Sequence, residues 1–186
     1  MKIDIFNTDK KYNIIYADPP WQYNDKMKMK GVHGMIRGAE FFYDTMSLQD
    51  IKALPIENIC SENAILFMWV TMPLLDKAFE VIESWGFKYK TCGFVWVKRT
   101  KTGKIHLGMG HYTRGNAELC LIGIKKKKPQ FHTRSLSQIV ESVIRKHSQK
   151  PDEIRDKIVD LCGDIPRIEL FARQYADGWD CWGNEV

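Results

Sequence analysis

The stretch YNIIYADPPW, residues 12–21, runs from β-branched and aromatic residues directly into two prolines. Its first six residues are typical of a buried β-strand. Proline fixes its own backbone angle, lacks an N–H donor and forces the residue before it into an extended conformation. We therefore expect a rigid loop that exposes the Asp18 carboxylate and a row of carbonyl oxygens beside the Trp21 indole. Such a loop complements a flat ring that carries an amino group, because it accepts hydrogen bonds and offers a face for stacking.

Size and composition predict one globular domain over residues 1–186. Hydrophobic residues make up 44% of the chain and charged residues 27%, which is ordinary for a folded protein and not for a disordered one. The longest apolar run, AILFMWV at 64–70, is too short to span a membrane, and the N-terminal residues lack the apolar core of a signal peptide. We expect a cytoplasmic protein without membrane contacts.

The five cysteines, at positions 60, 92, 120, 162 and 181, are scattered and form no C-x-x-C pair. The five histidines do not cluster with them. This spacing favours neither a disulfide framework nor a structural zinc site, and we expect no bound metal.

The net charge of +5 comes with three basic runs, at residues 26–30, 98–104 and 125–128. A net charge this small fits an ordinary solvated surface. If the runs lie in loops at one edge of the fold, they instead form a rim that faces a polyanion. The run at 125–128 is the weaker candidate, because a turn that follows a strand can lie at the opposite edge.

Periodicity and turn residues predict five strands and three helices. Ser47 is expected to cap a short helix that Pro55 breaks, and Gly86 and Gly163 are expected to end the other two helices. The segment 22–46 and the glycine-rich segment 101–115 are expected to be loops, and 136–145 is weakly patterned. The expected strands are 12–17, 63–70, 93–98, 118–124 and 167–172, and the expected helices begin at 47, 72 and 150.

Alternating strands and helices predict an α/β fold with a mostly parallel sheet and helices on both faces. In such sheets ligands bind outside the carboxyl ends of the strands. Two expected strands are followed by segments that combine acidic, aromatic and other polar residues. The first strand is followed by DPPW, and RIELF is followed by ARQYADGWDCWGNEV at the C-terminus. We expect both loops at the same edge of the sheet.

Several enzyme classes lose their main support because their motifs are absent from the sequence. No G-x-G-x-x-G follows a strand, no G-x-x-x-x-G-K-[ST] occurs, and no serine lies in a nucleophile-elbow context. The sequence therefore argues against a dinucleotide-dependent dehydrogenase, a P-loop ATPase and an α/β-hydrolase.

Seven blocks of the sequence occur in the order and approximate spacing of the MT-A70 family of adenine N6-methyltransferases, which the chain resembles from about residue 14 to residue 185. The resemblance implies a Rossmann-like methyltransferase fold in which the catalytic motif precedes the cofactor-binding strand. It also implies S-adenosylmethionine (SAM) as the cofactor and the 6-amino group of adenine in nucleic acid as the acceptor. The blocks are ADPPW, LFMWVT, GFVWVK, ELCLIGIK, HSQKPDEI, RIELFAR and WGNE.

The residues of the DPPW block suit this chemistry. The lone pair of an adenine 6-amino nitrogen is delocalised into the ring, and acceptors for both of its hydrogens favour the tetrahedral form that can reach a methyl group. We expect Asp18 and the Pro19 carbonyl to be these acceptors, with Pro20 fixing the loop. Trp21 is expected to stack on the base. The substrate-binding residues that we expect are Tyr23 and Tyr43 on the other face of the base, and Lys98, Arg99, Tyr112 and Arg114.

The resemblance also places residues on the cofactor side. It puts Lys150 at the SAM carboxylate, and Arg173 with Asn184 and Glu185 around the ribose, which suits an ammonium and hydrogen-bonding side chains. A surface lysine, a plain C-terminal turn and a surface ion pair are the alternatives for Lys150, Asn184 and Arg173. The cofactor-binding residues that we expect are Asp18, Lys150, Phe171, Arg173, Asn184 and Glu185.

The sequence therefore predicts a SAM-dependent DNA adenine N6-methyltransferase of bacterial or phage type. Its sequence specificity is expected to come from the loops at 22–46 and 98–116 or to be weak. The expected partner is nucleic acid, and a homodimer is one option for the assembly. RNA adenine is the nearest alternative substrate and the N4 position of cytosine the next. A catalytically silent nucleic-acid-binding subunit is the alternative from another class, and the intact DPPW block with Lys150 argues against it.

Overall fold

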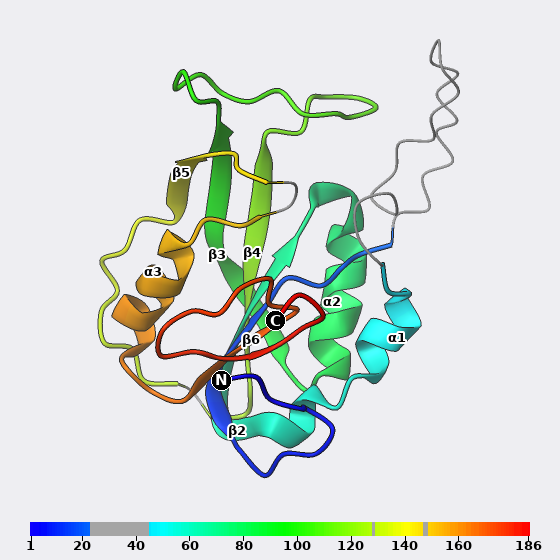
Figure 1. The fold of residues 1–186 in the computed structure, drawn as a ribbon, viewed down its shortest axis with the longest axis vertical. Coiled ribbons are helices and arrows are strands. Elements are labelled where there is room, and N and C mark those ends of the chain that lie inside the picture. Colours follow the sequence, from blue (N-terminus) through cyan, green and yellow to red (C-terminus); the bar gives the residue numbers. More distant parts are fainter. Residues whose placement is uncertain (23–44, 128, 147–148) are drawn as a thin grey trace.

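The computed structural model describes residues 1–22, 45–127, 129–146 and 149–186 (Figure 1). Within these residues, seven strands form one sheet in the order β5-β3-β4-β2-β1-β6-β7. The strands are β1 (Tyr12–Ala17), β2 (Cys60–Val70), β3 (Lys88–Arg99), β4 (Ala117–Ile124), β5 (Ile139–Val143), β6 (Arg167–Leu170) and β7 (Asp180–Trp182). The helices are α1 (Leu48–Ala53), α2 (Leu75–Ser84) and α3 (Glu153–Cys162), with short 3-10 helices η2 (Ile56–Ile59) and η3 (Met72–Leu74).

The sheet is mixed but mostly parallel, as the sequence predicts. β1 lies between the parallel strands β2 and β6, while β7 is parallel to β6 and β5 is parallel to β3. β4 is antiparallel to both of its neighbours, β2 and β3. The loop of residues 100–116 therefore joins β3 and β4 as a long hairpin without a crossover helix, a reversal that strand and helix alternation did not predict.

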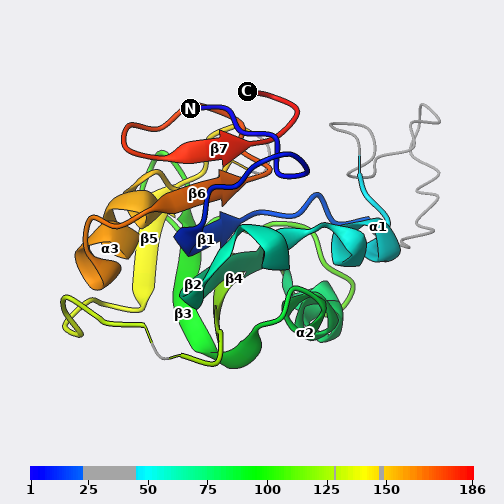
Figure 2. The same ribbon diagram turned by 90° about the horizontal axis from the view of Figure 1, so that it is seen from below.

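Helices cover both faces of the sheet, which confirms the predicted layers (Figure 2). Because side chains of a strand alternate between faces, Ile15 and Ala17 pack in the cluster that contains the buried residues of α1 and α2, whereas Ile14 and Tyr16 pack with those of α3. Burial on both faces explains why the central strands are continuous apolar runs.

The predicted helix ends are confirmed. The Ser47 hydroxyl accepts a hydrogen bond of 3.2 Å from the Asp50 N–H at the start of α1. Gly86, with φ of 76°, follows α2, and Gly163, with φ of 86°, follows α3. Two strands were not predicted: β5 lies within the weakly patterned segment 136–145, and the three-residue β7 lies in the C-terminal segment.

The strand pairing brings the two unusual loops to one edge, as predicted. Ala17 at the end of β1 pairs with Leu170 at the end of β6, so Asp18 and Phe171 follow neighbouring strands. β4 starts at this same edge, because Leu119 pairs with Val70 at the end of β2. At the other end of β4, Lys125 follows Ile124.

The run at 125–128 consequently starts at the opposite edge of the sheet. Ile124 pairs with Ile65 in the first half of β2. Lys125 forms an ion pair with Glu57, and Lys127 forms one with Glu62. Lys125 and Lys127 are therefore far along the sheet from Asp18 and paired with neighbouring carboxylates, whereas Lys128 lies outside the described residues.

The segment after β6 packs tightly against the segment after β7. Phe171 has a φ of 60°, a left-handed conformation that costs a residue with a side chain about 1–2 kcal/mol. The Ala172 N–H donates to the Trp182 carbonyl at 3.0 Å. A Cβ atom on Gly183 would lie 2.5 Å from the Ala172 carbonyl oxygen, so only glycine allows this approach.

Gly183→Ala should lower the free energy of unfolding by about 1–3 kcal/mol, because the added methyl group must displace backbone. Chemical denaturation followed by circular dichroism measures the change. Asn184→Ala, an exposed neighbour in the same turn, is the matched control and should change stability by less than about 0.5 kcal/mol. Equal effects of the two substitutions would contradict the close approach.

Candidate active site

Asp18 stands at the carboxyl end of β1 and is paired with Lys150, which lies in the loop before α3. The Lys150 Nζ atom lies 2.7 Å from Asp18 Oδ2, and the side chains are 11% and 20% exposed, respectively. Arg145 holds the Lys150 segment, because its guanidinium donates to the Lys150 carbonyl at 2.7 Å and pairs with Asp152 at 2.5 Å. The two predicted residues are thus brought into direct contact over a long sequence separation.

A second carboxylate, Glu118 at the start of β4, extends this pair into a row of alternating charges. Glu118 Oε2 lies 3.3 Å from Lys150 Nζ, and Glu118 Oε1 lies 2.5 Å from Lys98 Nζ at the end of β3. The row therefore reads Asp18, Lys150, Glu118, Lys98. Two indole rings flank it: the Lys150 ammonium is 5.7 Å from the Trp69 ring centroid, and the Lys98 ammonium is 5.0 Å from that of Trp96.

Burial and pairing act differently on the ionisable groups of this row. Burial raises the pKa of Asp18 above its ordinary value, although Lys150 opposes the shift. Burial also favours the neutral form of Glu118, but Lys150 and Lys98 outweigh it and lower the pKa of Glu118. Burial opposes the charge on Lys150, yet Asp18 and Glu118 raise the pKa of Lys150. Lys150 is therefore a permanent cation at neutral pH, and Glu118 is its second counter-ion.

The DPPW loop is less exposed than the sequence suggests. The Pro19 carbonyl accepts the Trp21 N–H at 2.8 Å, and the Pro20 carbonyl accepts the Met46 N–H at 2.9 Å. Trp21 is only 6% exposed, and its indole N–H donates to the Trp69 carbonyl at 3.1 Å. The expected row of free carbonyls is thus wrong for this structure, because the tryptophan folds the loop back onto the core.

The Pro19 carbonyl nevertheless keeps one of its two lone pairs for a further donor. The stacking of a base on Trp21 remains a prediction, because most of the Trp21 ring is covered by the core.

A second, largely buried ion pair joins β6 to α3. Glu169 in β6 and Arg155 in α3 form two parallel hydrogen bonds, of 2.6 Å and 2.9 Å, and Arg155 also binds Asp152 at 2.8 Å. Sequence reasoning missed Glu118, Glu169 and Arg155. The available signal was an acidic residue inside each of two apolar strands, since a charge that a strand buries requires a partner.

The cofactor-side residues predicted near the C-terminus come together. Arg173 Nε lies 3.6 Å from Glu185 Oε1, and the Phe171 ring centroid lies 5.2 Å from that of Trp182. Asn184 is exposed in the same turn. Burial is the main influence on the pKa of Asp18, and the Arg173 charge lowers this pKa, as Lys150 does. The turn that contains Arg173 therefore borders the Asp18 end of the row.

The predicted substrate-binding residues divide into three groups. Lys98 points into the charged row, and Arg99 pairs with Glu141 at 2.7 Å. Tyr112 and Arg114 are exposed in the loop of residues 100–116. Tyr23 and Tyr43, together with the basic run at 26–30, lie outside the described residues.

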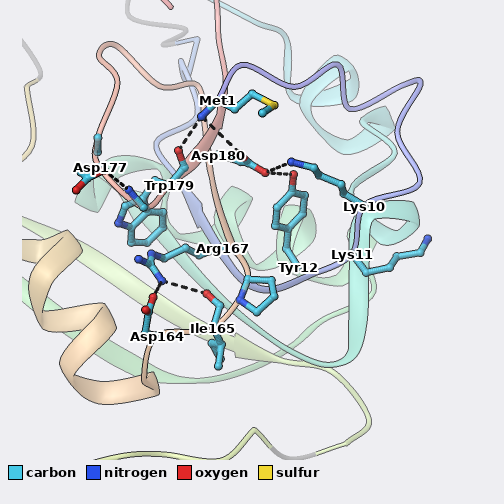
Figure 3. A pocket seen from close by; sticks show the side chains of 13 residues that line it. Met1, Lys10, Lys11, Tyr12, Asp164, Ile165, Arg167, Asp177, Trp179 and Asp180 are labelled. Carbon is cyan, nitrogen blue, oxygen red and sulfur yellow. Dashed lines mark hydrogen bonds and ion pairs between the residues drawn. The ribbon is translucent and has the colours of Figure 1, made fainter.

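A pocket of about 690 Å³ lies at the amino ends of β1, β6 and β7, on the side of the sheet away from Asp18 (Figure 3). Several of its charged groups are paired with other residues of its lining. Asp180 accepts from both Lys10 Nζ and the Tyr12 hydroxyl at 2.8 Å, and Arg167 pairs with Asp164 at 2.5 Å. We assign no chemistry to this pocket.

Across the part of the chain that the structure describes, no cluster of three or more His, Cys, Asp or Glu side chains has the arrangement to hold a metal ion. The described helices are all too short or too polar to cross a membrane.

The seven-stranded mixed sheet with helices on both faces makes the chain an α/β protein, and the charged row lies at the carboxyl end of β1. Comparison with protein families then gives its identity at the family level. Residues 12–185 match the MT-A70 family, and the chain belongs to that family. The resemblance seen in the sequence is thereby confirmed.

Three relatives show how the similarity is distributed. The chain is 37% identical over 189 residues to the type II methyltransferase M.MunI of a Mycoplasma species, a match that covers 95% of this chain and 78% of the relative. It is 28% identical to the human N(6)-adenosine-methyltransferase catalytic subunit METTL3, with 95% and 28% coverage. The MT-A70-like N(6)-adenosine-methyltransferase of Arabidopsis thaliana is also 28% identical, with 100% and 25% coverage. The chain thus spans about a quarter of the length of the plant and human relatives.

Glu118→Gln should destabilise the protein by about 3 kcal/mol at neutral pH, because it leaves the ammonium groups of Lys150 and Lys98, which are 11% and 22% exposed, with less compensation. For a chain of this size the melting temperature should fall by about 6–12 °C. Because the folded pKa of Glu118 is lowered, its contribution is present above the ordinary pKa of 4.5 and is lost as pH falls through the folded value.

Thermal unfolding of wild type and variant between pH 7 and pH 3 measures this dependence. The gap in melting temperature should close at the acidic end. Glu83→Gln, an exposed residue of α2, is the matched control and should leave the melting temperature nearly unchanged. A gap that is constant with pH would show that the carboxylate charge is not what stabilises the row.

Proposed function

We propose that the chain transfers a methyl group from SAM to the 6-amino nitrogen of adenine in DNA. The observation that carries this proposal is the cluster of Asp18, Lys150 and Glu118, which lies at the carboxyl end of β1 in a member of the MT-A70 family. The likeness to a type II methyltransferase, most of whose length this chain covers, favours DNA as the nucleic acid. RNA adenine is the second candidate, because other relatives are named as N(6)-adenosine methyltransferases.

The groups present at the site fit SAM. This cofactor carries a carboxylate, an ammonium, a sulfonium and a ribose diol, and when bound it supplies an electrophilic methyl group. Lys150 offers a charged donor for the carboxylate. Asp18 and Glu118 offer negative charge for the cationic groups, and the turn that contains Arg173, Asn184 and Glu185 offers donors and acceptors for hydroxyl groups.

Asp18 is proposed to orient the acceptor amine. One of its oxygens accepts from Lys150, and an ionised carboxylate has capacity for further hydrogen bonds. The remaining lone pair of the Pro19 carbonyl is the second proposed acceptor. Both groups are fixed by the strand end and by the proline backbone before the substrate binds. They form a preorganised negative environment for the positive charge that develops on nitrogen during methyl transfer.

Asp18 does not need to remove a proton before the methyl group is transferred. The acidity of the amine rises only after transfer, when the nitrogen becomes positively charged. The Lys150 ammonium at 2.7 Å opposes the rise in the pKa of Asp18 that burial causes, and it occupies one carboxylate oxygen, which suits an orienting group. The site also requires that the adenine leave any duplex stack, since the 6-amino group is otherwise out of reach.

The direct test offers labelled SAM together with single-stranded DNA, duplex DNA or RNA, followed by mass spectrometry of the nucleosides. The proposal expects N6-methyldeoxyadenosine as the main product. N6-methyladenosine in RNA alone would favour the second candidate, and N4-methylcytosine would change the target base. Retention of SAM and nucleic acid without any product would indicate a silent binding subunit instead.

Asp18→Asn should reduce the rate of methyl transfer by about 10²-fold or more, as the loss of one preorganised interaction does in other enzymes. The amide keeps an oxygen for Lys150, so the SAM dissociation constant, measured by calorimetry, should change only a few-fold. Asp76→Asn, an exposed acid of α2, is the matched control and should have no effect on either value. A near-wild-type rate for Asp18→Asn would exclude the role of the carboxylate.

Lys150→Ala should raise the SAM dissociation constant about tenfold or more, because a charge-assisted hydrogen bond contributes roughly 1.5–3 kcal/mol. Calorimetry below the melting temperature measures it, and nucleic-acid affinity should be nearly unaffected. Lys90→Ala, at the exposed start of β3, is the control. Unaltered SAM binding by a folded Lys150→Ala protein would remove Lys150 from the cofactor site.

A further inference from the structure

The loop of residues 100–116, which connects β3 to β4, extends from the edge of the sheet that carries the candidate active site (Figure 1). The strand residues on either side of the loop belong to that site. Lys98, near the end of β3, and Glu118, near the start of β4, are the last two members of the charged row. Any molecule that lies across the row therefore meets this loop.

The loop exposes apolar side chains that the core does not use. Leu107 is 67% exposed, Met109 is 62% exposed and Tyr112 is fully exposed, with Ile105 at 46%. Apolar groups gathered on a projecting segment and surrounded by polar residues are typical of an interaction site.

Backbone contacts hold the loop in a narrow, two-sided shape. The Gly108 N–H donates to the Gly115 carbonyl at 2.9 Å, and the Gly115 N–H donates to the Met109 carbonyl at 3.2 Å. A Cβ atom on Gly108 would lie 2.4 Å from the Gly115 carbonyl oxygen, and one on Gly110 would lie 2.0 Å from that of Thr113. The glycines thus keep the two sides of the loop close together, while Leu107 and Met109 point side chains into solvent.

The charge of the loop indicates which molecule it contacts. The segment contains Lys101, Lys104 and Arg114, all exposed, and has no acidic residue between positions 99 and 118. Among the residues that the structure describes, no acid forms an ion pair with any of these three cations. A polyanion complements this surface, whereas a second copy of the chain would bring the same positive charge against it.

We propose that this loop is a wedge that enters duplex DNA beside the target adenine. Leu107 and Met109 fill the stacking position that the extruded base leaves, Tyr112 stacks beside them, and Lys101, Lys104 and Arg114 contact the flanking phosphates. Apolar side chains inserted between base steps, with cations at the backbone, are how other proteins unstack a duplex. The inference rests on the proposed function, because a wedge is needed only if the base must leave the stack.

The test uses Leu107→Ser together with Met109→Ser, which removes the apolar surface and keeps the charge of the loop. The substrates are a pool of DNA duplexes that contains every six-base sequence, and the same pool as single strands. The double variant should methylate the duplex on the order of 10²-fold more slowly than wild type, because extrusion loses its support. On single strands, where no base must be extruded, its rate should stay within about threefold.

The matched comparison is Lys101→Ala with Lys104→Ala and Arg114→Ala. This variant should lose activity on both substrates and should show a flatter dependence of binding on salt, since it removes phosphate contacts. Equal losses on duplex and single strand by the apolar variant would overturn the wedge in favour of a general contact. Unchanged activity of the apolar variant on duplex would also overturn it.

A second readout does not require methyl transfer. Permanganate oxidises thymines that have lost their stacking, so wild-type protein bound to the duplex pool should produce reactive thymines and the apolar variant should not. If wild type methylates nothing but still produces this pattern, the proposed function fails and the wedge stands. If wild type binds duplex without reactive thymines, the wedge is excluded whatever the methylation assay shows.

Discussion

The Lys150 ammonium, buried between the carboxylates of Asp18 and Glu118, is the interaction on which the arrangement of the site depends. Two carboxylates cannot be buried side by side without a cation, and an isolated ammonium is equally unfavourable in the interior. The three groups therefore fix one another. Together they join the end of β1, the start of β4 and the loop before α3. Strand pairing brings these segments to one edge of the sheet, and the ion pairs then hold them in contact.

The sequence predicted those strands and helix ends that local residues determine, such as apolar runs, a capping serine and glycines. The strand before Asp18, the cap at Ser47 and the glycine ends of two helices were all correct, because apolar runs and special backbone angles act locally. The meeting of the DPPW loop with the segment after RIELF was also correct, since parallel strands end at one edge. Lys150 came from the family resemblance; its ion pair with Asp18 was not predicted, and its place at the SAM carboxylate stays a prediction.

Other features could not be read from the sequence, because they arise from pairing in three dimensions. β5 and β7 are short edge strands in whose sequences polar and apolar residues do not alternate, so only the pairing with neighbouring strands defines them. In the sequence Glu118 is one polar position of an apolar strand. Only the structure shows that it pairs with Lys98 and Lys150. The Pro19 carbonyl was expected to be exposed, but it accepts the Trp21 N–H, and the Trp21 indole packs in the core and donates to the Trp69 carbonyl.

The members of the charged row are widely separated along the chain, and Asp18 and Lys150 are 132 positions apart. A contact of that range closes a long loop, whose entropic cost must be met before the contact contributes anything. During synthesis Asp18 and Glu118 leave the ribosome well before Lys150 does. Glu118 already has Lys98 as a counter-ion at that stage, whereas Asp18 gains its cation only when the loop before α3 has been made.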